Sequence, residues 1–163
     1  MRDKTTPDGQ PDDARVQRAI LNLILDPDRQ RPLSEPEIAR AIGHPQQTAG
    51  ALEHLYCAGL IHRWNGLLTA THPAVRQHEL IHGERSSIED RDELLVLEVL
   101  IEQPSEEPPS EADLERKLAE DDPKRRIDVL DALDRLDRAG LIDRRGQRVH
   151  PARVVLCLDA LSL

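Results

Sequence analysis

The chain has 163 residues, and its 22 Lys and Arg against 31 Asp and Glu give a formal net charge of −9. Aromatic side chains are almost absent, because there is no Phe and only one Tyr (Tyr56) and one Trp (Trp64). The core must therefore be aliphatic, a composition that favours helices. It excludes single-stranded nucleic-acid modules, which stack bases on several aromatic rings.

The sequence also predicts where the protein resides. No apolar run approaches the roughly 18 residues of a membrane span, and residues 1–13 lack the apolar stretch of a signal peptide. We therefore expect a cytoplasmic protein that makes no membrane contact. Cys57 and Cys157 are too few for a disulfide framework, and we expect both to be buried, reduced thiols.

The chain contains two copies of one unit. Four blocks recur in the same order, at offsets of about 76 to 81 residues. The matching pairs are 20–25 with 96–101, 34–38 with 110–114, 51–61 with 132–142, and 72–74 with 150–152. Four ordered matches indicate a tandem repeat.

Each copy is predicted to begin with an apolar helix, over residues 14–25 and 93–101, buried on most sides. A second, brief helix follows a serine that stands where an N-cap is expected. Ser34 with Glu37 forms a capping box, and Ser110 with Asp113 forms a weaker variant with a shorter acidic side chain.

A third helix begins at Pro45 or Pro123 and ends at Gly59 or Gly140, typical positions for a first-turn proline and a left-handed glycine. We expect its inner face to carry Leu52 and Leu55 in the first copy, and Ile127, Leu130 and Leu133 in the second. Two hairpins are then predicted around Asn65-Gly66 and Arg145-Gly146.

This order of elements resembles the winged helix-turn-helix family over residues 12–163. The matching runs 55–63 and 136–144, each containing Ala-Gly-Leu-Ile, look like the end of a recognition helix and the start of a wing. The resemblance implies a mainly α protein with small β-hairpin wings and two tandem winged helix-turn-helix domains. The expected boundaries are a disordered tail over 1–11, domains over 12–83 and 93–163, and a linker with a helix start over 84–92.

The resemblance extends to two kinds of winged-helix protein. The first is the bacterial transcriptional regulator that binds double-stranded DNA. The second is the segregation-and-condensation protein B type, which serves protein assembly.

Local charge points to DNA contacts in the second copy. Residues 124–153 hold nine Lys or Arg against five Asp, a balance of +4, whereas residues 84–123 have a balance of −11. Because a helix N-terminus and a wing favour phosphate contacts, we expect DNA contacts from Lys124, Arg125, Arg126, Arg135, Arg144, Arg145 and Arg148. Asp131 with Arg135 is equally typical of a solvated helix face.

The first copy offers base contacts. A helical wheel from Pro45 directs Thr48, Ala49, Ala51, Leu52, Leu55 and Tyr56 inward and leaves Gln46, Gln47, Gly50, Glu53 and His54 outward. Gln can pair with adenine, and Gly permits close approach, so Gln46, Gln47 and His54 are the candidate base contacts. Arg40, His62 and Arg63 are the candidate supporting cations. We expect Trp64 to pack against its own hairpin, the alternative being a partner contact.

Two further features suggest other functions. Residues 78–82, His-Glu-Leu-Ile-His, match a zinc-peptidase pattern, but no third ligand motif follows. Arg76 and Gln77 beside them are expected at the surface. The apolar tail, represented by Val154, Val155, Leu156, Leu158 and Leu161, needs cover from this chain, a partner or a second copy, and we expect a homodimer.

The leading functional prediction is therefore a DNA-binding transcriptional regulator that is not an enzyme and has no cofactor or bound metal. The alternatives are a protein assembly or adaptor module with a possible protein partner and, third, a zinc peptidase.

Overall fold

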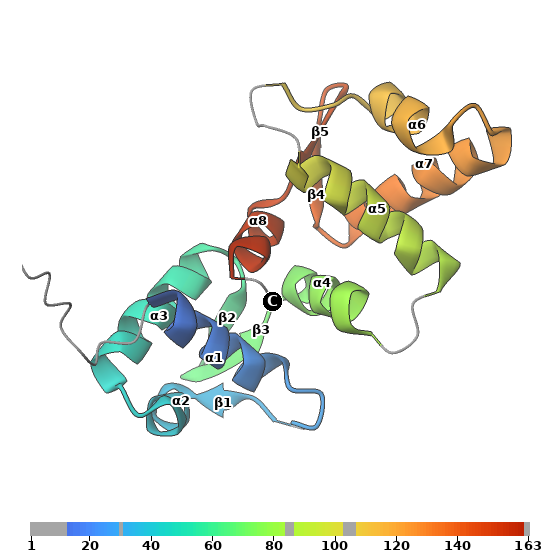
Figure 1. Ribbon diagram of the computed structural model, residues 1–163. Coiled ribbons are helices and arrows are strands. Elements are labelled where there is room, and N and C mark those ends of the chain that lie inside the picture. Colours follow the sequence, from blue (N-terminus) through green and yellow to red (C-terminus); the bar gives the residue numbers. More distant parts are fainter. Residues whose placement is uncertain (1–12, 30, 84–86, 103–106, 162–163) are drawn as a thin grey trace, which may run out of the picture.

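The computed structural model describes residues 13–29, 31–83, 87–102 and 107–161. Its elements run in the order α1 (Asp13–Leu25), β1 (Leu33–Ser34), α2 (Glu35–Ile42), α3 (Pro45–Cys57), β2 (Ile61–Trp64), β3 (Leu67–Ala70), α4 (His72–His82), α5 (Ile88–Glu102), α6 (Glu111–Ala119), α7 (Pro123–Arg138), β4 (Ile142–Arg145), β5 (Arg148–Pro151) and α8 (Arg153–Ala160). The protein is mainly helical with two small antiparallel sheets (Figure 1).

The order of elements repeats, as the sequence predicts. Three helices, a hairpin and a closing helix occur over 13–82, here called the first half, and again over 88–160, here called the second half. The helix predicted over 93–101 is longer and begins at Ile88. The predicted tail over 1–11 lies outside the described residues. A short strand that the sequence does not reveal, β1, pairs with β3 in the first sheet.

The local signals act as expected at the ends of the helices. Pro45 and Pro123 begin α3 and α7, and Gly59 and Gly140 follow these helices with φ of 76° and 72°. The capping box at Ser110 is complete, since Asp113 N donates to Ser110 Oγ at 3.1 Å and Ser110 N donates to Asp113 Oδ2 at 3.0 Å. The shorter Asp side chain is therefore long enough to reach back to the cap, and the relative strength of the two boxes stays a prediction.

The two halves share one aliphatic core. Helix α4, the last helix of the first half, contacts both α5 and α8 of the second half (Figure 1). The Gln77 side chain donates to the Val155 carbonyl at 3.4 Å, so Gln77 is buried and the expectation of a surface position is wrong. The amide nitrogen of Gln77 thus has a backbone acceptor, whereas its amide oxygen is buried without a hydrogen-bond partner in the described part of the chain.

Four expectations about side-chain orientation are wrong. Ile127 and Leu130 of α7 are exposed, and Val129, Ala132, Leu133 and Leu136 form its inner face. On α3, Ala49 is exposed and Tyr56 is half-exposed. Trp64 is 76% exposed and does not pack on its hairpin. Cys57 is exposed and Cys157 is only half-buried.

Among the described residues, no helix is both long enough and apolar enough to cross a bilayer.

Candidate nucleic-acid interface

The outward face of α3 is small and nearly uncharged. Gln46, Gly50 and His54 are exposed along it, and a side chain added at Gly50 would meet no heavy atom within 4 Å. His54 Nδ1 lies 3.3 Å from the side-chain amide nitrogen of Gln17 on α1, a contact that favours one orientation of the ring. A polar face with room for close approach suits a groove of double-stranded DNA.

Gln47 is less available than the sequence suggests. Its side chain is half-buried, and its amide oxygen is buried without a hydrogen-bond partner in the described part of the chain. Gln46 is therefore the better candidate of the two for a base contact.

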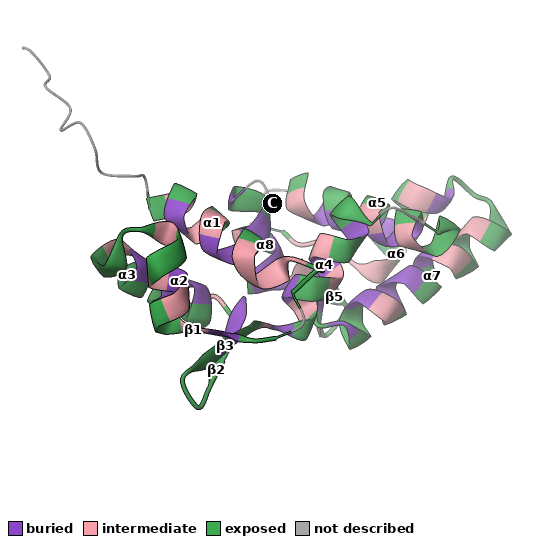
Figure 2. Cartoon of the chain, turned by 90° about the horizontal axis from the view of Figure 1, so that it is seen from below, coloured by how far each residue is buried: buried purple, intermediate pink, exposed green. Residues whose placement is uncertain are grey.

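An ion pair joins α3 to the first hairpin. Arg63 of β2 contacts Glu53 of α3 at 3.2 Å, and the same guanidinium lies 5.7 Å from the centre of the Tyr56 ring. This pair neutralises the one carboxylate on the outward face of α3. The hairpin itself protrudes from the body (Figure 2), with Trp64 directly opposite Leu67 at its tip.

The second half has an equivalent ion pair. One of the arginines predicted to bind DNA forms this pair. Arg144 of β4 contacts Asp134 of α7 at 2.7 Å and also lies 3.4 Å from Glu111 of α6. Only a quarter of its side chain is exposed. Arg144 therefore holds the second hairpin against α6 and α7 and is not free to contact a phosphate.

Most of the other predicted phosphate contacts also have partners within the chain. Arg125 pairs with the buried Asp92 at 2.6 Å, Arg135 pairs with the buried Glu93 at 2.7 Å, and Arg126 lies 3.4 Å from Asp121. Arg148 donates to the Pro108 carbonyl at 2.8 Å. Within the described residues, no acceptor contacts the ammonium group of Lys124. Arg145 is 75% exposed and lies 3.5 Å from Asp143.

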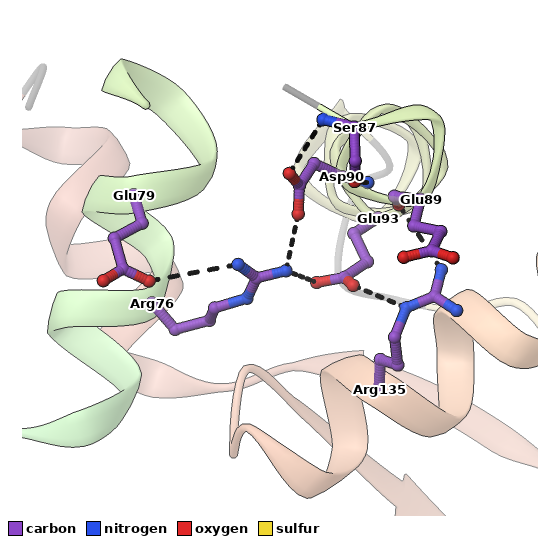
Figure 3. Close-up of polar contacts among 7 residues, drawn as sticks. All are labelled: Arg76, Glu79, Ser87, Glu89, Asp90, Glu93 and Arg135. Atoms are coloured by element: carbon purple, nitrogen blue, oxygen red, sulfur yellow. Dashed lines mark hydrogen bonds and ion pairs between the residues drawn. The ribbon is translucent and has the colours of Figure 1, made fainter. Parts of the chain in front are cut away.

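The sequence did not reveal the network that occupies Arg135. Glu93 of α5 is 1% exposed and accepts from Arg76 of α4 at 3.0 Å and from Arg135 of α7 at 2.7 Å. Arg76 also donates to Asp90 at 2.8 Å (Figure 3). The expectation that Arg76 lies at the surface is therefore wrong, because a buried carboxylate requires cationic partners. The network ties the first half to two helices of the second.

The protonation states within this network are well defined. Burial opposes the charge on Arg76, but the hydrogen bond to Asp90 and the charge of Glu93 outweigh it, and the pKa of Arg76 is raised. Burial likewise opposes the charge on Asp90, and its hydrogen bonds from Arg76 and Ser87 outweigh that effect and lower its pKa. Both groups are thus charged at neutral pH.

The zinc-like pentad lies at the end of α4. The rings of His78 and His82 have centroids 4.7 Å apart, and Glu79 is exposed, 3.9 Å from Arg76. The described residues contain no group of three His, Cys, Asp or Glu side chains able to hold a metal ion. Burial, followed by the charge of His82, lowers the pKa of His78.

The apolar tail is largely covered by this chain. Val154, Val155, Leu158 and Leu161 are buried, and Leu156 alone of the five predicted interface residues is exposed. Arg18 of α1 donates to the Leu161 carbonyl at 2.7 Å. The tail therefore provides no reason to expect a second copy, and the homodimer stays a prediction.

Comparisons with known proteins add little. No family model matches the chain, and no curated protein matches it. A conserved hypothetical protein from Chlorobium tepidum is similar in structure, with 19% sequence identity over 93% of this chain and 98% of that chain. The TM-score of 0.32 is too low for this similarity to support an argument about fold or function.

Proposed function

We propose that this protein is a tandem winged-helix protein that binds double-stranded DNA through its first half and acts as a transcriptional regulator. The observation that supports this proposal is the outward face of α3, where Gln46, Gly50 and His54 are exposed and the charge of Glu53 is neutralised by Arg63. In a helix-turn-helix protein, the third helix enters the major groove, and α3 has a face suited to that position.

Charge favours the first half over the second. Within the described residues, the first half contains seven Arg against seven Asp or Glu, a net charge of zero. The second half contains 12 Lys or Arg against 19 Asp or Glu, a net charge of −7. Asp131, Asp134 and Asp137 are exposed on α7 and would repel phosphates. The DNA-binding helix is therefore α3 rather than α7.

The proposal predicts weak, moderately salt-dependent binding. Arg40, His62 and Arg63 are the candidate supporting cations beside α3, and Arg63 is already paired. With only two or three phosphate contacts, log affinity should fall against log salt with a slope of roughly −2 to −3. Affinity for nonspecific duplex should be on the order of micromolar only at low salt.

Fluorescence anisotropy of a labelled mixed-sequence duplex, starting near about 50 mM salt, tests the proposal. We expect Arg40→Glu to weaken binding several-fold and the matched reversal Arg145→Glu to change it less than about twofold. Absence of binding at low salt would refute DNA binding. A larger loss with Arg145→Glu than with Arg40→Glu would instead assign the contact to the second half.

A further inference from the structure

A cavity of about 270 Å³ opens between the start of α5 and the first turns of α7. Ile88 and Glu89 line it from α5, and Lys124, Asp128 and Asp131 line it from α7. We call these five residues, together with Ile127 beside them on α7, the α5–α7 groove. It lies away from α3 and plays no part in the proposed DNA contact.

The charges of the groove are not balanced. Asp92 and Arg135, at its base, are already paired with Arg125 and Glu93. The carboxylates of Glu89, Asp128 and Asp131 have no ion-pair partner within the described residues, and Lys124 is the only unpaired cation lining the cavity. The groove therefore has an excess of two negative charges, which a cationic ligand group would complement.

The edge of the groove is apolar. Ile88, which lines the cavity, is 74% exposed, and Ile127 is 61% exposed. Ile127 lies one helical turn from both Lys124 and Asp131, so its side chain borders the cavity. Exposed aliphatic side chains beside a cavity are typical of a contact surface.

This combination distinguishes the second half from the first. At the positions of Ile127 and Asp131, the repeat offset of 81 places Gln46 and Gly50 in the first half. The exposed aliphatic and acidic residues at these two positions are therefore not a requirement of the shared fold.

We propose that the α5–α7 groove binds a segment of a protein partner that carries Lys or Arg beside aliphatic side chains. The cations would pair with Asp128, Asp131 and Glu89, and the aliphatic groups would cover Ile88 and Ile127. Negative charge excludes a nucleic acid as the occupant, and the aliphatic edge distinguishes the partner from a simple polycation.

The test uses the full chain and a fluorescent amphipathic peptide built from Leu and Lys, with a second peptide in which every Leu is replaced by Ser. We expect the Leu-Lys peptide to bind more tightly than the Ser-Lys peptide. Asp128→Asn with Asp131→Asn should lower its affinity at least fivefold. The charge-matched control, Glu98→Gln with Glu107→Gln, should lower it less than twofold, because both residues are exposed and neither lines the groove.

Equal losses in the two double variants, or equal binding of the two peptides, would overturn the proposal in favour of diffuse electrostatic attraction. A stable dimer that Ile127→Ser dissociates would also overturn it, since the occupant would then be a second copy. Binding of duplex DNA by the Asp128 and Asp131 variant should be undiminished. Failure of the peptide test therefore leaves the proposed DNA function unaffected, and the reverse also holds.

Discussion

The third helices of the two halves have the same inner face and different outer faces. Leu52 and Leu55 of α3 correspond to Leu133 and Leu136 of α7, and all four are buried. Outside, the neutral face of Gln46 and Gly50 is replaced by the apolar and acidic face of Ile127 and Asp131. Packing constrains the inner positions, whereas the outer positions are free to differ, and they differ in the chemistry that decides binding.

The hairpin tips show the same divergence. Trp64 lies opposite Leu67 at the tip of the first hairpin, and Arg145 lies opposite Arg148 at the tip of the second. Like charges directly opposite each other weaken a hairpin, and Arg148 is held by the Pro108 carbonyl instead. A repeated scaffold has therefore acquired two distinct surfaces, which we relate to two different partners.

The largest expected effect comes from breaking the connection between the halves. Glu93→Gln removes the buried charge that Arg76 and Arg135 share. Because the two arginines are partly exposed, we expect a loss of about 2–4 kcal/mol in the free energy of unfolding, somewhat less than for a fully buried pair. Urea denaturation measures this loss. Glu98→Gln, exposed on the same helix, should cost less than about 0.5 kcal/mol, and a similar cost for both would contradict the role of the network.

A smaller loss of stability is expected when either of the two ion pairs between a third helix and its hairpin is removed. Arg144→Ala removes ion pairs to both Asp134 and Glu111, whereas Arg63→Ala removes one longer ion pair to Glu53 and the contact with the Tyr56 ring. We expect Arg144→Ala to cost about 1 kcal/mol and Arg63→Ala about half as much or less, as for partly exposed pairs. Thermal unfolding of both variants measures the difference, and equal costs would show that the shorter pair gives no advantage.

The fluorescence of the single tryptophan can distinguish binding at the first half from binding at the second half. Trp64 is the only Trp and lies on the first hairpin, so its fluorescence should be readily quenched by acrylamide. We expect duplex DNA to reduce this quenching and the Leu-Lys peptide to leave it unchanged. Protection of Trp64 by the peptide would show that the two surfaces are not separate.

The acidic residues of the two capping boxes predict a loss of stability in acid. The hydrogen bond from Arg31, then those from Ser34, lower the pKa of Glu37 to about 2, and Ser110 lowers the pKa of Asp113. As the pH falls, Glu37 therefore binds its proton in the unfolded chain before it does so in the folded chain, so its stabilisation is present above pH 4.5 and is lost as the pH falls toward 2. Glu37→Gln should flatten the dependence of the urea midpoint on pH in this range. An unchanged profile would contradict the assignment.

The smallest effect concerns the histidine pair of α4. Because burial contributes more than His82 to the lowered pKa of His78, His82→Ala should raise that pKa only partway to its ordinary value. NMR titration of the imidazole protons measures the change. Full recovery would show that charge rather than burial dominates. Zinc added in the same experiment should leave the wild-type spectrum unchanged, and site-specific binding would favour the peptidase alternative.

Much of the fold can be predicted from local signals. Ser110 with Asp113, Pro123 and Gly140 act on backbone within a few residues, so each marks its own element end. Because the unit is repeated, each of these signals occurs twice in the chain. The strand β1 has only two residues and is formed by pairing with β3. It is too short to show a periodic pattern that would predict it.

The orientation of α7 was predicted wrongly for a geometric reason. A strict three-residue spacing, as at Ile127, Leu130 and Leu133, drifts around a helix of 3.6 residues per turn. The alternative stripe through Val129, Leu133 and Leu136 stays on one side, and it is buried. Packing against α5 and α6 selects that stripe, which leaves Ile127 in solvent.

The sequence by itself determined the tandem repeat, the helices and their ends, and the two hairpins, because these depend on short-range backbone preferences and periodicity. Tertiary structure decided which charges are available for binding. Glu93 is 17 residues from Arg76 and 42 from Arg135, and no local pattern reveals that these groups meet. A buried carboxylate is stable only beside cations, so folding sequesters arginines that a charge count assigns to the surface.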